Sequence, residues 1–153
     1  MPSFTEQLQR IVTRYREDGQ PWPATSRALA AWAISNGLWQ PQRAALLSQC
    51  ADQISRALRE EYITDPQGRR VRTKHPARVE RDGKQLVLWD DIRTASRSHM
   101  RVAFQSRRQQ IVGDCHQLKI DVDSFNDNRS PLEPIQMNFN FTRDLEELEA
   151  VLD

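Results

Sequence analysis

Hydrophobic periodicity changes near residue 62, and this change limits the folds that the chain can adopt. Before it, apolar residues recur every three or four positions, the period of an amphipathic helix. Between residues 62 and 89, two turn signals stand among β-prone residues, Asp65-Pro66-Gln67-Gly68 and Asp82-Gly83. A proline-free stretch then follows to about residue 122. We therefore expect an α+β chain, mostly α, with a small antiparallel sheet between three helices and a long one.

Two short helices are expected first. The segment Ser3–Glu6 has the pattern of a capping box and should begin a helix over about residues 4–16. A second helix, capped by Thr25 or Ser26, should end at Ser35, where Asn36-Gly37 gives a stop signal.

A third helical segment is expected over residues 42–61. Its apolar stripe has helical spacing and consists of Leu47, Ala51, Ile54, Leu58 and Tyr62. The pattern fits either one helix or two helices divided near Cys50, and the sequence leaves both alternatives open.

The segment from Tyr62 to Trp89 is predicted to form a small antiparallel sheet with a basic loop. If Asp82-Gly83 is a two-residue turn, Val79 lies opposite Leu86 and Ala77 lies opposite Leu88. These four apolar residues then share one face of the hairpin, as the period of two requires.

A long helix is expected from about residue 92 to 122, opened by Asp90-Asp91. Four large apolar residues in and just beyond it lie seven positions apart: Phe104, Ile111, Leu118 and Phe125. Cys115 and Val122 occupy companion positions, but Arg108 places a charge in the same row. The stripe is expected to pack against the first helices, or alternatively to form a homodimer through the 94–122 helix.

The last thirty residues are expected to be a linker and an acidic tail. Residues 124–134 have linker composition, residues 135–141 alternate like a strand, and Thr142 can cap a short helix over 143–152. We therefore predict a domain over residues 1–123 and a tail over 124–153. The strand is expected to pack on its own domain, or alternatively to bind the sheet edge of a protein partner through Met137, Phe139 and Phe141.

Charge is distributed unevenly along the chain, although the net charge is only +1. Residues 66–108 carry twelve basic and four acidic side chains, and residues 109–153 carry three basic and ten acidic ones. The resulting charges of +8 and −7 suggest a basic surface for a polyanion and an acidic tail that covers it. In the alternative, the two segments face each other within the fold.

No motif predicts catalysis. The sequence has no P-loop, no dinucleotide-binding glycine pattern and no paired-histidine zinc motif, so we expect no enzyme, no cofactor and no metal. No apolar run approaches the ~18 residues of a membrane span. Residues 1–10 lack the apolar stretch of a signal peptide, so the expected location is cytoplasmic, away from membranes. Cys50 and Cys115 are expected to be reduced thiols.

The order helix, helix, helix, hairpin over residues 4–89 resembles winged helix-turn-helix domains. Within it, residues 51–59 look like a recognition helix. The resemblance implies that Leu47, Ile54 and Leu58 anchor this helix to the core. It also implies that its other side reads bases in the major groove. The candidate base-reading residues are Gln53, Ser55, Arg56 and Arg59.

The same resemblance implies a basic wing that contacts phosphates or the minor groove. Its candidate residues are Arg69, Arg70, Arg72, Lys74 and Arg78. For Arg56 and Arg59, ion pairing with neighbouring acids on a solvated helix is the favoured alternative to base contact.

These observations favour a non-catalytic regulatory protein of bacterial or phage type that binds nucleic acid, preferentially DNA. The alternative is a protein-interaction adaptor that docks a partner through the long helix and the C-terminal tail. The two differ in salt dependence, because phosphate binding releases counterions and an apolar interface does not.

Overall fold

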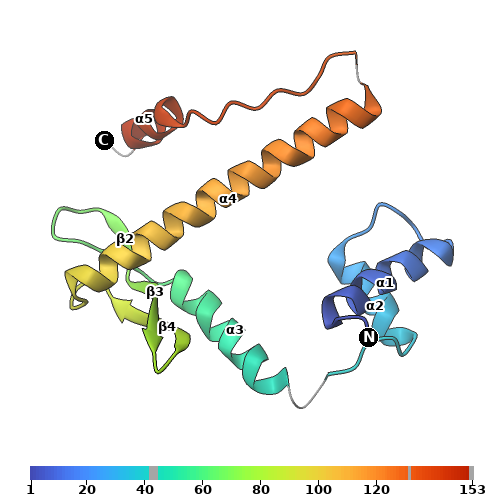
Figure 1. Cartoon of the computed structure of the whole chain (residues 1–153), viewed down its shortest axis with the longest axis horizontal. Helices are drawn as coiled ribbons and strands as arrows, with labels where there is room; N and C mark the ends of the chain where they lie inside the picture. The colour runs from blue at the N-terminus through green and yellow to red at the C-terminus, as the bar shows by residue number, and fades with distance from the viewer. Residues whose placement is uncertain (42–44, 131, 152–153) are drawn as a thin grey trace. The chain divides into compact units, whose positions relative to one another are not determined.

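The computed structural model describes residues 1–41, 45–130 and 132–151. Their contacts divide the chain into two compact units, Met1–Ser55 and Arg56–Asp153. The described residues contain five helices and two antiparallel β-hairpins, and the chain is α+β and mostly helical, as predicted (Figure 1). None of these helices is long and apolar enough to span a bilayer.

The first unit begins with α1 (Phe4–Glu17) and α2 (Ser26–Ser35). The capping box of α1 is confirmed, because the Ser3 hydroxyl accepts from the Glu6 N–H and the Glu6 carboxylate accepts from the Ser3 N–H. Thr25 caps α2 by accepting a hydrogen bond from the N–H of Ala28 at 3.1 Å. Local sequence alone therefore determines where both helices start.

Tyr15 is the most buried aromatic residue of this unit, with 4% of its surface exposed. Its ring meets the edge of the Trp32 ring at a centroid distance of 5.5 Å, which joins α1 to α2. Its hydroxyl donates to the carbonyl of Pro21 at 2.8 Å, so the polar end of the side chain is also satisfied.

Helix α3 (Leu46–Arg59) is continuous through Cys50, so the described part of the third segment is one helix. Residues 42–44, where this prediction began, lie outside the described residues. Leu47 and Ile54 are 83% and 54% exposed, and only Leu58 is half-buried. The predicted anchoring of this stripe is therefore wrong for Leu47 and Ile54, because an amphipathic pattern does not specify what covers its apolar face.

Two separate hairpins follow in the second unit, where one sheet was predicted. Strand β1 (Tyr62–Thr64) pairs with β2 (Arg70–Arg72), and β3 (Lys74–Arg81) pairs with β4 (Lys84–Asp91). The predicted register of Val79 opposite Leu86 and Ala77 opposite Leu88 is confirmed. Asp82 and Gly83 both have positive φ angles, 51° and 75°, as a type I′ turn requires.

Thr73 joins the two hairpins and is completely buried. Its N–H donates to the carbonyl of Glu61 at 3.0 Å, and its carbonyl accepts from the N–H of Ile92 at 2.9 Å. The start of the first hairpin and the end of the second are therefore held on one residue.

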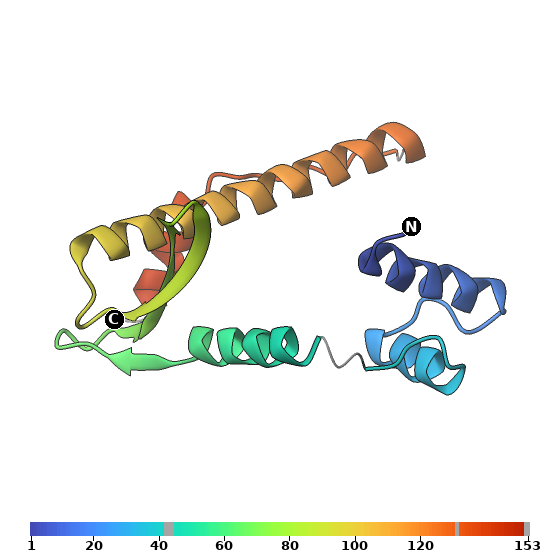
Figure 2. The same ribbon diagram turned by 60° about the horizontal axis from the view of Figure 1, so that its bottom comes forward.

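Helix α4 (Arg97–Arg129) is one long helix, drawn in yellow to orange in Figure 2. Ser96 caps it, and it continues through Gly113. Asp90 and Asp91 end β4, so the prediction that they open this helix is wrong. The N-terminal part of α4 packs on β3, where Ala103 and Ala77 are 4% and 1% exposed. The four apolar residues that lie seven positions apart are 40% to 51% exposed: Phe104, Ile111, Leu118 and Phe125.

The predicted linker is wrong over its first half, because residues 124–129 belong to α4. Asparagine usually favours turns because its amide competes for backbone hydrogen bonds. Here the Asn128 amide donates to the carbonyl of Ser124 one turn earlier, and that of Asn126 binds outside the helix. These side chains are therefore satisfied without ending the helix.

The segment 135–141 pairs with no strand of the described chain, so the strand prediction is not confirmed. Instead, the side chain of Asn126 donates to the carbonyl of Ile135 at 2.8 Å and accepts from its N–H at 3.0 Å. Helix α5 (Thr142–Val151) ends the described chain, and Thr142 is its first residue and not its cap. The tail is thus tied to α4 by one bidentate amide.

Candidate nucleic-acid interface

Four cationic side chains of the second unit line one small cavity, which we call the arginine pocket. They are Arg59 at the end of α3, Arg72 on β2, Lys74 on β3 and Arg107 on α4. Pro76, His75, Ala103, Ser106 and Gln110 complete its lining, and its volume is about 80 Å³. Cationic residues up to 48 positions apart in the sequence thus share one site.

Local structure explains why these side chains converge. Arg107 lies one helical turn beyond Ala103, on the side of α4 that packs against β3. The small side chain of Ala103 permits a close approach of α4 to the strand. Arg59 is held at the rim, with its guanidinium carbon 5.5 Å from the centroid of the Trp89 ring.

Two histidines support the strand that carries Arg72. The Nε2 of His75 lies 2.8 Å from the carbonyl oxygen of Arg72, and the Nε2 of His99 lies 2.8 Å from the carbonyl oxygen of His75. Each nitrogen carries the proton it donates, since a carbonyl only accepts. His75 is 5% exposed and its ring packs edge-on against Phe104. The backbone of the pocket is therefore fixed by side chains from β3 and α4.

The pocket carries positive charge that its neighbours do not neutralise. Burial lowers the pKa of Arg107, and the charge of Arg72 lowers it further, against a smaller opposing effect of Tyr62. Within residues 45–130 and 132–151, no carboxylate lies within 4.0 Å of the guanidinium nitrogens of Arg59, Arg72 or Arg107. An anion in the pocket would relieve this repulsion.

Lys74 differs from the three arginines. Its Nζ lies 2.8 Å from a carboxylate oxygen of Glu61 and 3.8 Å from one of Asp91. Asp91 also binds Arg93 at 2.7 Å, and the hydrogen bonds of Arg93 hold the pKa of Asp91 well below its usual range. The charge of Lys74 is therefore largely neutralised by these carboxylates and is less available to an anion than that of the arginines.

The other predicted wing residues are not part of the pocket. Arg69 binds the carboxylate of Asp65 at 2.8 Å and closes the first hairpin turn, while its side chain stays 71% exposed. The guanidinium of Arg70 lies 4.4 Å from the centroid of the Tyr62 ring, and it too is exposed. Arg78 is exposed on β3.

The predicted base-reading residues lie along α3. Gln53 and Arg56 are exposed, and Ser55 is half-buried. Ion pairing was the favoured alternative for Arg56 and Arg59, but in the part of the chain that the structure describes neither has a carboxylate within 4.0 Å. Both cations therefore remain available to a ligand.

Sequence reasoning missed Arg107, because the predicted interface ended with the hairpin. Its signal was present, since Arg107 belongs to the segment of charge +8 and follows the small Ala103 by four residues. Recognising it required the packing of α4 on β3, which no local pattern specifies.

The tail residues predicted to bind a partner have different surroundings. Met137 and Phe141 are 48% and 42% exposed. Phe139 is half-buried in a hollow that it shares with Lys119 and Val122 of α4. Phe139 thus faces the same hollow as side chains of α4, whereas Phe141 does not line it.

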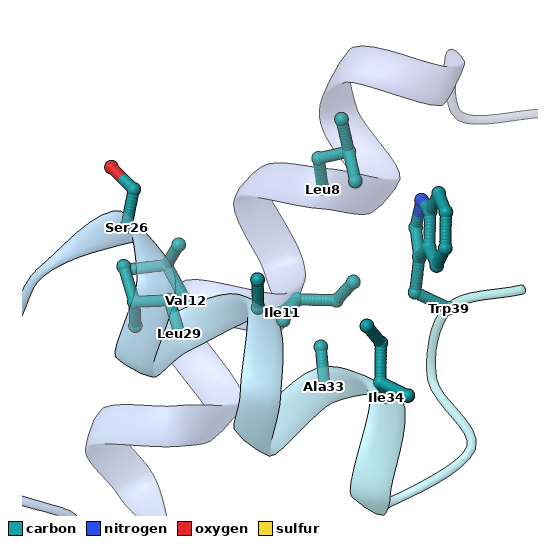
Figure 3. Close-up of a pocket in the computed structure, with 9 residues that line it drawn as sticks. Leu8, Ile11, Val12, Ser26, Leu29, Ala33, Ile34 and Trp39 are labelled. Carbon is teal, nitrogen blue, oxygen red and sulfur yellow. The ribbon is translucent and has the colours of Figure 1, made fainter.

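A third hollow lies in the first unit, between α1 and α2. It is an apolar groove of about 530 Å³ (Figure 3). Leu8 comes from α1, Ile34 from α2, and Trp39 from the segment after α2. Leu8, Ile11, Val12, Ser26, Leu29, Ala30, Ala33, Ile34 and Trp39 line it. Its chemistry differs from that of the arginine pocket, because the groove is apolar and the pocket is cationic.

Among the described residues, no three histidine, cysteine, aspartate or glutamate side chains gather as metal ligands would. The arrangement that remains is a set of hydrogen-bond donors suited to an anion. Comparison of the chain with protein-family models, with curated proteins and with solved structures finds no match.

Proposed function

We propose that the chain is a non-catalytic nucleic-acid-binding protein, with DNA the favoured ligand, and that the arginine pocket is its main phosphate contact. The observation that supports this is the convergence of Arg59, Arg72 and Arg107 from three elements without a carboxylate partner in the described chain. Each guanidinium offers a planar fork of donors that matches two phosphate oxygens. In this proposal the exposed Gln53 and Arg56 of α3 supply base contacts, in the manner of winged helix-turn-helix domains.

Salt dependence tests this proposal. Each neutralised phosphate of a duplex contributes about −0.9 to the slope of log K against log salt concentration. The double variant Arg72→Ala/Arg107→Ala should therefore bind a random-sequence duplex more weakly, with a slope shallower by about 1.8. Fluorescence anisotropy at about 50 and about 200 mM salt measures both quantities.

A matched control removes the same charge from the acidic segment. Arg129 stacks on Phe125 and Arg143 pairs with Glu147, so neither belongs to the pocket. Arg129→Ala/Arg143→Ala should keep the affinity and slope of the unmodified protein. Equal losses in the two double variants would mean that only net charge matters, and an absence of binding at low salt would contradict the proposal.

A second candidate function is the protein-interaction adaptor, which the exposed stripe of α4 and the exposed Met137 and Phe141 support. The apolar groove between α1 and α2 adds a further surface of the same kind (Figure 3). An interface of this chemistry buries apolar area and is nearly indifferent to salt. A partner whose affinity is unchanged between the two salt concentrations would favour this function.

A further inference from the structure

The size of the arginine pocket limits what part of a ligand enters it. Its volume is about 80 Å³. Sites that hold whole small-molecule ligands have volumes of about 300–1,000 Å³. The pocket is therefore too small to enclose a whole nucleotide, and its size suits a single tetrahedral oxyanion.

The donors of the pocket also fit an oxyanion with several free oxygens. The side chains of three arginines line it from different elements, and Ser106 and Gln110 flank Arg107 with neutral donors one turn apart. Lys74 adds little charge because Glu61 already pairs with it. The ring Nε2 of His75 is occupied by the carbonyl of Arg72.

Phosphate groups of nucleic acids come in two kinds. A bridging phosphodiester carries one negative charge and a nucleotide on each side, so it meets a surface lengthwise. A terminal monoester carries about −1.5 to −2 at pH 7 and three free oxygens. The monoester presents an end that enters a small, partly enclosed cavity more readily than a phosphodiester does. Its charge also better matches three guanidiniums that have no carboxylate partner among the described residues.

We infer that the arginine pocket binds the terminal phosphate monoester of a nucleic-acid strand. This inference rests on the proposed function and narrows it from backbone contact to strand ends. Arg70 extends the site, because residues 70 and 72 of β2 lie on the same face of the strand. Arg70 is exposed on the ring of Tyr62, where it meets the phosphodiester that follows the terminal group.

The test compares strands that differ only at their ends. Short single strands of one sequence, labelled internally, carry a 5′-phosphate, a 3′-phosphate or hydroxyls at both ends. Anisotropy titrations use the full chain at neutral pH. A strand with a terminal phosphate should bind roughly tenfold or more tightly than the hydroxyl-ended strand, as expected for charge-assisted hydrogen bonds.

Variants assign the preference to the pocket. Arg72→Ala/Arg107→Ala should abolish the difference between phosphate and hydroxyl ends. Arg81→Ala/Arg101→Ala, which removes two exposed charges from the same unit outside the pocket, should keep it. Arg107→Lys retains the positive charge but loses the planar pair of guanidinium donors. It should keep part of the preference for phosphate ends over hydroxyl ends. Far-UV circular dichroism verifies that every variant is folded.

The outcomes separate this inference from the function on which it rests. Equal, salt-sensitive binding of all strands would overturn the inference and leave the proposed function standing. Binding of no strand would overturn both, even if inorganic phosphate shifted the arginine Nε resonances. A phosphoserine peptide that bound as tightly as the phosphorylated strand would also overturn the inference, since the ligand would then be a protein.

Discussion

The bidentate amide of Asn126 should determine how firmly the tail is held on α4. Its two hydrogen bonds to the backbone of Ile135 measure 2.8 and 3.0 Å, and both are exposed to solvent. An exposed hydrogen bond contributes about 0.5 kcal/mol to stability, the lower end of the usual range. Asn126→Ala removes two such bonds and should therefore lose about 1 kcal/mol of local stability. That corresponds to a roughly fivefold higher population of the open tail.

Hydrogen exchange at the Ile135 N–H measures this opening directly, because that group donates to the Asn126 side chain. Its protection should fall roughly fivefold in Asn126→Ala. Asn126→Asp keeps an acceptor for this N–H and loses the donor, so it should show a smaller effect.

Asn128→Ala is the matched control. The Asn128 amide binds only Ser124 of the same helix, so its loss should leave Ile135 protected. Unchanged protection in Asn126→Ala would refute the reasoning and assign the attachment of the tail to contacts other than this amide. Equal losses in both alanine variants would instead indicate fraying of the helix end.

Four further predictions concern two glycines, one carboxylate and the exposed stripe of α4. Gly83 has a φ of 75°, so Gly83→Ala should destabilise the protein by about 1 kcal/mol in thermal unfolding. Gly113 lies in α4, and a Cβ there would meet nothing within 4 Å. Gly113→Ala should therefore stabilise the protein by up to ~1 kcal/mol in the same assay. The hydrogen bond donated by the Arg69 N–H lowers the pKa of Asp65 in the folded state. This carboxylate therefore stabilises the fold above about pH 4, and the stabilisation is lost as pH falls through the folded pKa. Asp65→Asn should make the free energy of unfolding fall less steeply at acid pH. If α4 forms a homodimer, Ile111→Lys should give monomers in sedimentation velocity.

Each of these has an outcome that contradicts it. A stabilising Gly83→Ala would mean that the turn is not of type I′. An acid limb that is unchanged in Asp65→Asn would assign the loss of stability to other carboxylates, of which Asp91 is the first candidate because Arg93 lowers its pKa. A protein that is monomeric at all concentrations would exclude the dimer.

Elements with local signals could be predicted from the sequence. The capping box at Ser3 and the Asp82-Gly83 turn depend on residues within four positions of each other, and both form as expected. The register of β3 and β4 follows from that turn, because a two-residue loop allows one pairing.

Elements that depend on distant partners could not be predicted in the same way. The alternation of residues 135–141 matches a strand, but a strand also needs a neighbouring strand to bind its backbone. At Ile135 the side chain of Asn126 forms these backbone hydrogen bonds instead. Likewise, Arg59, Arg72 and Arg107 form a site only through the packing of α4 on β3. The exposure of Leu47 and Ile54 has the same explanation. An apolar stripe indicates that a helix face favours burial, but it does not specify which element covers that face.

The buried backbone at Thr73 has a consequence for the kinetics and cost of ligand capture. Hydrogen bonds to Glu61 and from Ile92 hold Thr73, and that from His75 holds the adjacent carbonyl of Arg72. The wall that bears Arg72 therefore shifts only if buried backbone bonds break. Preorganisation of this kind means that an arriving anion orders side chains but no main chain, so capture proceeds without a slow opening step.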